Sequence, residues 1–145
     1  MNTFQLNFDN RLKAWYDLRE KLSGHNIESI CIDVDKFWQL CPLVNHYLHT
    51  DYMSEWPGPW ELIAENNYCP YARALGMVYT LLFLGIKDID LVDAIDNNSE
   101  DVVLVLVDNA KYILNYWPET VLSNSLQDFK ITKRHSLASI ITKIG

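Results

Sequence analysis

Hydrophobic residues recur at helical spacing near the start of the chain. Between Phe8 and Leu22, apolar side chains return every three or four positions, Asp9 can cap the start, and Gly24 follows the end. A capping residue before such a pattern and a glycine after it are typical of a helix. The pattern therefore predicts a helix over residues 9–22.

Proline divides the next part of the chain. A short helix is predicted over 33–41, where Pro42 stops it. Another is predicted from Pro59 to about Glu65, because proline suits the first turn of a helix. Between them, residues 42–59 predict an irregular connection that is rich in aromatic side chains.

The middle of the chain allows two interpretations. An asparagine pair can cap a helix that begins near Pro70 and stops at Gly76. The apolar run over 77–84 then favours a strand that is buried on both faces. One long buried helix over 70–84 is the alternative, because periodicity does not separate the two for a continuous apolar run.

Strand-forming residues dominate the rest of the chain. A weak alternation over 89–95 predicts one strand, and six consecutive apolar residues over 102–107 predict the strongest strand. A turn at 108–110 and a returning strand over 111–116 complete a hairpin. A last strand is predicted over 129–132, and a short helix over 136–144. Helices first and strands second predict an α+β fold, with N-terminal helices packed on a C-terminal antiparallel sheet.

The length of 145 residues predicts a single domain over 1–145. Its parts would be helical over about 8–76, mainly β over about 77–132, and a basic C-terminal tail over 129–145. With 49% apolar residues, the chain can bury a core without metal or disulfide support.

The charge is negative and unevenly placed. A net charge of -7 argues against direct nucleic-acid binding, which needs clustered cations. The chain has no acid after Asp128 but four cations there: Lys130, Lys133, Arg134 and Lys143. We interpret this tail as a solvated segment, with an arm that docks on an acidic partner or on a second copy as the alternative.

Cysteine usage indicates a reducing environment. Cys31, Cys41 and Cys69 are an odd number without close spacing, so they predict free buried thiols. No signal peptide is visible, and the apolar run over 74–86 is shorter than the ~18 residues of a membrane span. We therefore expect a soluble protein of a cell interior, or a part of a particle assembled inside a cell, with no membrane contact.

A cysteine at a helix start precedes the strong hairpin. Cys69 opens the run Cys-Pro-Tyr-Ala-Arg-Ala-Leu-Gly-Met, and Asn115 ends the second hairpin strand. Over residues 66–117 this order resembles the transglutaminase-like superfamily, relatives of the papain-like cysteine proteases. The resemblance implies a degenerate fold of that kind, with Cys69 at the nucleophile position and Asn115 at the position that orients a catalytic histidine.

The histidine of that superfamily has no counterpart. Its hairpin position is Val102 here, and no histidine lies between Cys69 and Asn115. Because a thiol catalyst needs a base to remove its proton, we interpret Cys69 as a packing residue. A cysteine hydrolase or acyltransferase that uses Cys69 is the alternative.

Other runs resemble a viral group. Trp-Pro-Gly-Pro-Trp-Glu-Leu-Ile at 56–63 and Ala-Lys-Tyr-Ile-Leu-Asn-Tyr-Trp-Pro at 110–118 resemble small uncharacterised proteins of T-even-like tailed bacteriophages. This resemblance implies a viral origin and a place in the host cytoplasm or the virion, and it implies no chemistry.

Two polar clusters are weighed as metal sites and rejected. His46 and His49 are three residues apart, but they lie in the predicted loop without a fixed third ligand. The acidic run over 88–101 lacks the spacing of a calcium-binding loop. We predict neither a metal nor a cofactor, and the acidic run leaves an acidic inhibitor of a host defence enzyme as a further alternative.

The aromatic loop and the basic tail are the candidate contact residues. Large aromatic side chains on a proline-rich loop make good anchors for protein contacts. The leading prediction is therefore a non-enzymatic phage structural or accessory protein that binds other phage proteins or a second copy. The predicted binding residues are Tyr47, Tyr52, Trp56, Trp60, Lys133 and Arg134.

Overall fold

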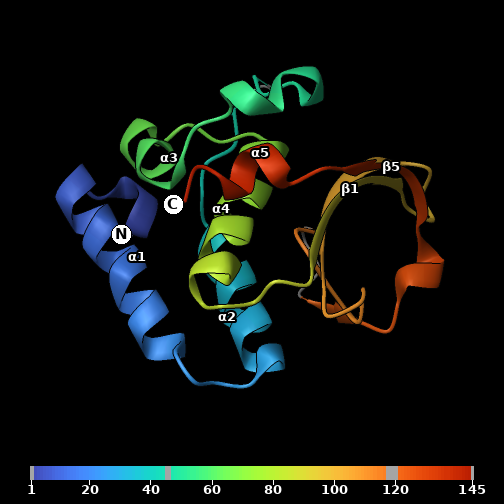
Figure 1. Ribbon diagram of the computed structural model, residues 1–145, viewed down its shortest axis with the longest axis horizontal. Helices are drawn as coiled ribbons and strands as arrows, with labels where there is room; N and C mark the ends of the chain where they lie inside the picture. Colours follow the sequence, from blue (N-terminus) through green and yellow to red (C-terminus); the bar gives the residue numbers. More distant parts are fainter. Residues whose placement is uncertain (1, 45–46, 117–120, 145) are drawn as a thin grey trace.

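The computed structural model describes residues 2–44, 47–116 and 121–144, with helices first and a sheet second (Figure 1). The helices are α1 (Phe8–Leu22), α2 (Ile27–Gln39), α3 (Pro59–Glu65), α4 (Pro70–Phe83) and α5 (Ala138–Ile141). The strands are β1 (Ile89–Ile95), β2 (Asp101–Val107), β3 (Tyr112–Leu114), β4 (Leu122–Ser123) and β5 (Lys130–His135). Short 3-10 helices cover Thr3–Gln5, Thr50–Glu55 and Leu126–Asp128. The predicted α+β fold is confirmed.

The first two helices begin at asparagine caps. The side chain of Asn7 accepts a hydrogen bond from the backbone of Asn10 and starts α1, close to the predicted boundary. Asn26 caps α2 in the same way through Ser29, so α2 begins six residues before the predicted start at 33. The prediction missed this start because it relied on apolar spacing and overlooked the cap.

Helix α4 corrects the favoured prediction of a strand over 77–84. Residues 70–83 form one continuous helix, and its residues 72–81 are all buried. A helix enclosed on every side has no polar face, so its sequence looks like a doubly buried strand. The chain turns instead at Gly85, whose φ of +85° suits glycine.

Gly76 marks a close contact rather than the end of α4. A Cβ at this position would lie 2.5 Å from two ring atoms of Trp38. The indole N–H groups of Trp15 and Trp38 both donate to the hydroxyl of Thr80, at 2.8 and 3.0 Å. These contacts fix α4 against α1 and α2, and Figure 1 shows α4 between α1 and the sheet.

The sheet is antiparallel, with strand order β4-β3-β2-β1-β5. One face packs on α4 through Leu91, Val105 and Leu114, which belong to the main core. The opposite face carries a second cluster that includes Leu104 and Leu106. Because both faces are covered, β2 is apolar without alternation, as predicted for residues 102–107.

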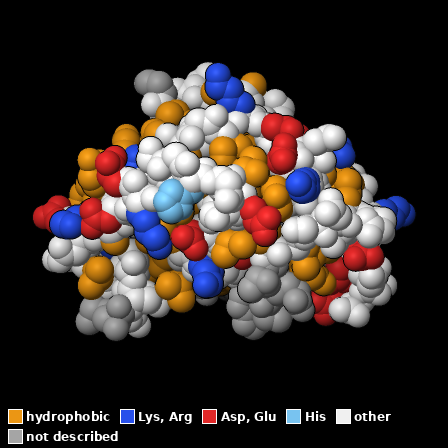
Figure 2. All heavy atoms as spheres, turned by 90° about the horizontal axis from the view of Figure 1, so that it is seen from below, with side chains coloured by type: hydrophobic (Ala, Val, Ile, Leu, Met, Phe, Trp, Pro, Cys, Tyr) orange, Lys and Arg blue, Asp and Glu red, His pale blue; other side chains and the backbone are white. Residues whose placement is uncertain are grey.

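The C-terminal segment is neither a solvated tail nor a free arm. Residues 130–135 form β5, which pairs with β1 at the edge of the sheet. Arg134 contacts Asp90 of β1 at 3.2 Å, and Lys143 donates to the backbone oxygen of Ser54 at 2.9 Å. Ile140 in α5 is fully buried. On the face seen in Figure 2, cations lie among acids rather than in one block.

Two further sequence predictions concern the cysteines and the length of the apolar segments. Cys31, Cys41 and Cys69 are free and buried, as predicted. Within the described ranges, no helix is both long enough and apolar enough to cross a membrane.

Candidate functional site

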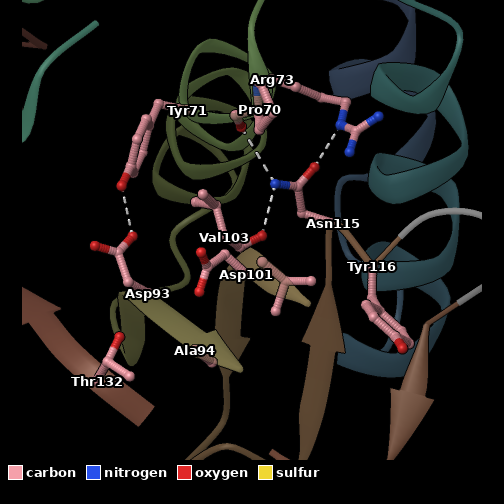
Figure 3. Close-up of a pocket in the computed structure, with 11 residues that line it drawn as sticks. Pro70, Tyr71, Arg73, Asp93, Ala94, Asp101, Val103, Asn115, Tyr116 and Thr132 are labelled. Atoms are coloured by element: carbon pink, nitrogen blue, oxygen red, sulfur yellow. Dashed lines mark hydrogen bonds between the residues drawn. The ribbon is translucent and has the colours of Figure 1, made fainter. Parts of the chain in front are cut away.

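A pocket of about 490 Å³ lies where the first turn of α4 faces the sheet (Figure 3). Helix α4 supplies one wall, strands β1, β2 and β5 supply the opposite wall, and the residues after β3 close one end. The lining residues are Pro70, Tyr71, Arg73, Asp93, Ala94, Asp101, Val102, Val103, Asn115, Tyr116 and Thr132.

Asn115 joins the elements that meet at the pocket. Its side-chain nitrogen donates to the carbonyl oxygens of Val103 (2.9 Å) and Pro70 (3.3 Å), and its side-chain oxygen accepts from Nε of Arg73 (2.5 Å). Its backbone N–H donates to Asp35 of α2 at 2.9 Å. The residue has a φ of 72°, a left-handed conformation that asparagine tolerates better than most residues. Asn115 therefore holds α2, α4 and β2 together.

Two buried opposite charges, Arg73 and Asp35, both form hydrogen bonds with Asn115. Arg73 is 6% exposed and Asp35 is 3% exposed. Burial raises the pKa of Asp35, while hydrogen bonds from Asn115 and Gln39 act in the opposite direction. Burial likewise lowers the pKa of Arg73. Arg73 forms no direct ion pair with a carboxylate of the described residues, so Asn115 stands between the two charges.

The sheet wall of the pocket carries two carboxylates. Tyr71 donates its hydroxyl to Oδ1 of Asp93 at 2.7 Å, and Oδ2 of Asp93 lies 3.1 Å from Nε2 of the buried His135. Burial raises the pKa of Tyr71, and Asp93 and Asp101 raise it further. Asp93 in β1 pairs with Val103 in β2. Asp101 lies two residues before Val103 and so on the same face of β2. Asp93 and Asp101 are therefore diagonal neighbours on one face of the sheet.

Cys69 occupies the position before the first turn of α4 but does not line the pocket. Its side chain is fully buried and makes no capping hydrogen bond with the helix. Burial raises the pKa of the neighbouring thiol of Cys41 to about 12. The structure thus places Cys69 at the helix start that the sequence predicted, with its thiol enclosed.

The sequence analysis placed the histidine position of the transglutaminase-like superfamily at Val102, but the structure indicates the next residue, Val103. Val103 packs with the main core on the α4 side of β2, whereas Val102 packs with the cluster on the other face. Val103 is therefore the residue that faces α4 from this part of β2. No histidine of the described ranges lines the pocket: His135 lies behind Asp93.

The two histidines that the sequence analysis rejected as metal ligands are only partly described by the structure. His46 lies outside the described residues, and His49 precedes the 3-10 helix, where its carbonyl accepts from the indole of Trp56. Within the described ranges, no group of three His, Cys, Asp or Glu side chains could hold a metal ion.

The predicted contact residues divide into buried and exposed ones. Trp56 is 2% exposed and belongs to the core, so it is not available to a partner in this structure. Tyr47 is partly buried and donates its hydroxyl to the backbone oxygen of Asn67. Tyr52 and Trp60 are exposed, at 60% and 49%. Lys133 and Arg134 are exposed on β5. Their role in a partner contact stays a prediction.

Sequence reasoning missed the charged residues of the pocket. Arg73 stands between two alanines in an otherwise apolar helix, and a lone cation there is a signal of a buried polar site. Asp93 and Asp101 were merged into one acidic run, because their common face appears only when β1 and β2 pair.

Comparison with known proteins identifies the fold. No family model matches the sequence, and no curated protein matches it. Calcium-bound LapG of Legionella pneumophila matches with a TM-score of 0.75 and 15% identity, over 96% of this chain and 90% of that chain. LapG treated with EGTA matches with a TM-score of 0.72 and 17% identity, over 89% of this chain and 74% of that chain. LapG is a cysteine protease with a transglutaminase-like fold.

The chain therefore has the transglutaminase-like fold, as the order of residues 66–117 implied. The structural likeness corrects the leading functional prediction. A non-enzymatic phage structural or accessory protein is contradicted, because the matching structures are those of a protease. The comparisons give no support to a phage origin.

Proposed function

We propose that the protein takes a peptide or another amide-bearing molecule into the pocket at the start of α4, as a protease takes its substrate. The observation that carries the proposal is the position of the pocket. It lies between the first turn of α4, strand β2 and Asn115. The resemblance of residues 66–117 implies that the reacting groups of this fold lie at these elements.

The lining of the pocket suits a peptide. Pro70 and Val103 supply apolar surface, while Asn115, Asp101 and Arg73 supply polar groups. Binding sites for small molecules are typically concave, with volumes of about 300–1,000 Å³ and a few polar groups that fix orientation. The volume of about 490 Å³ falls within that range.

Hydrolysis or acyl transfer at Cys69 is the second candidate. It is favoured by the place of Cys69 at the N-terminus of a helix of 14 residues, since helix N-termini stabilise a thiolate. The enclosed side chain and the lack of a histidine among the described lining residues weigh against it. A test of the proposed function must therefore measure binding and cleavage separately.

The binding test uses a random peptide library and a variant that fills the pocket. Val103→Trp places a large side chain on the wall that faces α4, and we expect it to abolish peptide binding measured by fluorescence anisotropy. Glu20→Trp adds the same side chain at an exposed position of α1 and should leave binding unchanged. Thermal melts of both variants verify that they fold. The absence of any peptide that binds the wild type and not Val103→Trp would refute the proposal.

The chemical test follows cleavage of the selected peptides and the alkylation of Cys69. Mass spectrometry after iodoacetamide treatment at neutral pH reports the modification of Cys31, Cys41 and Cys69 separately. Faster modification at Cys69, together with peptide cleavage that Cys69→Ser removes, would establish the second candidate. Equally slow modification of the three thiols without cleavage would exclude it.

A further inference from the structure

We propose that Arg73 binds a carboxylate of the peptide that enters the pocket. This inference rests on the proposed function and names the chemical class of its ligand. The carboxylate can belong to an acidic side chain or to a free C-terminus, and both present the same group to a guanidinium.

The hydrogen bonding of Arg73 is incomplete when compared with another buried arginine. Arg11 is 8% exposed, and three of its nitrogens donate to the backbone oxygens of Ile63, Leu6 and Ala64. Arg73 is equally buried, but among the described residues only its Nε has an acceptor, the side chain of Asn115. The two terminal nitrogens of Arg73 remain for a ligand.

A buried cation without a direct partner is costly. Removing a charge from water costs several kcal/mol unless an opposite charge and hydrogen bonds compensate for it. Asp35 compensates in part, but Asn115 separates it from Arg73. A carboxylate in the pocket would supply the missing charge and could accept two parallel hydrogen bonds from the guanidinium fork.

The start of α4 adds to the preference for an anion. Arg73 lies in the first turn of a helix that has no acidic residue in that turn and no side-chain cap from Cys69. The N-terminal end of a helix carries a partial positive charge, which favours an anion in the part of the pocket lined by the first turn of α4. The guanidinium of Arg73 and the N-terminal end of α4 therefore both favour an anionic ligand.

The sheet wall restricts the rest of the ligand. Asp93 and Asp101 lie across the pocket from α4, and Figure 3 shows them on the strands below the helix. A ligand with several negative charges would be repelled by this wall. We therefore infer one carboxylate toward Arg73, followed by a neutral or basic residue toward Asp93 and Asp101.

The experiment compares each selected peptide in matched forms. One pair differs only in a free or amidated C-terminus, and a second pair differs in Glu against Gln within the sequence. We expect the carboxylate form of one pair to bind roughly tenfold tighter or better, which corresponds to about 1.4 kcal/mol. The pair that shows the preference identifies the source of the carboxylate.

Variants locate the preference at Arg73. Arg73→Gln should bring the two forms to equal affinity, and Arg73→Lys should keep part of the preference because it keeps the charge. Asp101→Asn removes a negative charge from the opposite wall and should keep or increase the preference for the carboxylate form. Arg11→Gln is the matched control for loss of a buried arginine, and it should lower the melting temperature without changing the ratio of affinities.

The outcomes separate the inference from the proposed function. Equal binding of both forms by the wild type would overturn the role of Arg73 and leave peptide binding intact. An unchanged ratio in Arg73→Gln would do the same. No binding of either form would refute the proposed function itself. If Arg73→Gln does not fold, the wild-type ratio and Arg73→Lys still decide the question.

Discussion

Replacing Asn115 by alanine tests whether this residue clamps the site. The substitution removes three side-chain hydrogen bonds, to Arg73, Val103 and Pro70. A bond to a charged group contributes about 1.5–3 kcal/mol and a neutral bond about 1 kcal/mol. Alanine also tolerates the left-handed φ of 72° less well than asparagine. We expect a loss of about 3–5 kcal/mol in the free energy of unfolding.

Glycine at the same position separates the two causes. Asn115→Gly removes the same side chain but adopts the left-handed conformation without strain, while it gains freedom in the unfolded chain. We expect it to be more stable than Asn115→Ala by about 0.5–1 kcal/mol. The assay is unfolding in guanidinium chloride followed by tryptophan fluorescence. A loss below about 1 kcal/mol for Asn115→Ala would show that Asn115 does not hold the elements together.

Three other predictions concern packing, acid stability and self-contact. Gly76→Ala should destabilise the protein by about 1–3 kcal/mol despite a better helix propensity, because its Cβ would collide with the ring of Trp38; calorimetry that shows an equal or higher melting temperature would contradict this. Hydrogen bonds from the backbone of Glu100 and from other groups hold the pKa of Asp96 below its usual value. The ionised carboxylate of Asp96 therefore stabilises the fold at pH values above its pKa in the unfolded chain. This stabilisation is lost as the pH falls through the lower pKa of the folded protein. Asp96→Asn should therefore flatten the loss of stability below about pH 4 in acid titrations followed by circular dichroism, and an unchanged acid limb would refute this. If Lys133 and Arg134 hold a second copy, light scattering should show a dimer at low salt that Lys133→Glu with Arg134→Glu dissolves, whereas a monomer at every salt concentration would exclude the contact.

The sequence predicted the fold where local signals and packing agree. The hairpin formed by β2 and β3 was predicted because β2 is apolar throughout and a turn at 108–110 follows it. Helix α1 was predicted from its apolar spacing, but the capping residue is Asn7 and not the predicted Asp9, which lies inside the first turn. A single helix at α4 was only the alternative prediction, because tertiary burial removes its polar face and Gly76 looked like a helix end; the structure bears the alternative out.

The site was predicted only in part for a similar reason. Cys69 and Asn115 were found because both follow from order along the chain. Arg73 and Asp101 were missed because their meeting depends on the approach of α4 to the sheet. The basic C-terminal residues were misjudged because a charged edge strand and a solvated tail have the same composition, and only the pairing of β5 with β1 separates them.

The hydrogen bond between Arg73 and Asn115 also bears on whether this fold could act as a thiol catalyst here. In a triad, the residue at the position of Asn115 orients an imidazole. Its side-chain oxygen is already the acceptor for Arg73, and its nitrogen donates to two backbone oxygens. A histidine on the facing wall would therefore have to share the Asn115 oxygen with Arg73.

This argument predicts the result of restoring the histidine alone. Val103→His puts an imidazole on the side of β2 that faces α4, yet the thiol of Cys69 stays enclosed and Asn115 stays bonded to Arg73. We expect the rate of iodoacetamide alkylation at Cys69 to remain that of the wild type at pH 7, with Cys31 as the internal reference for global opening. Selective acceleration of alkylation at Cys69 in Val103→His would mean that the new imidazole reaches the thiol. The wild-type site would then lack only the base of a thiol catalyst.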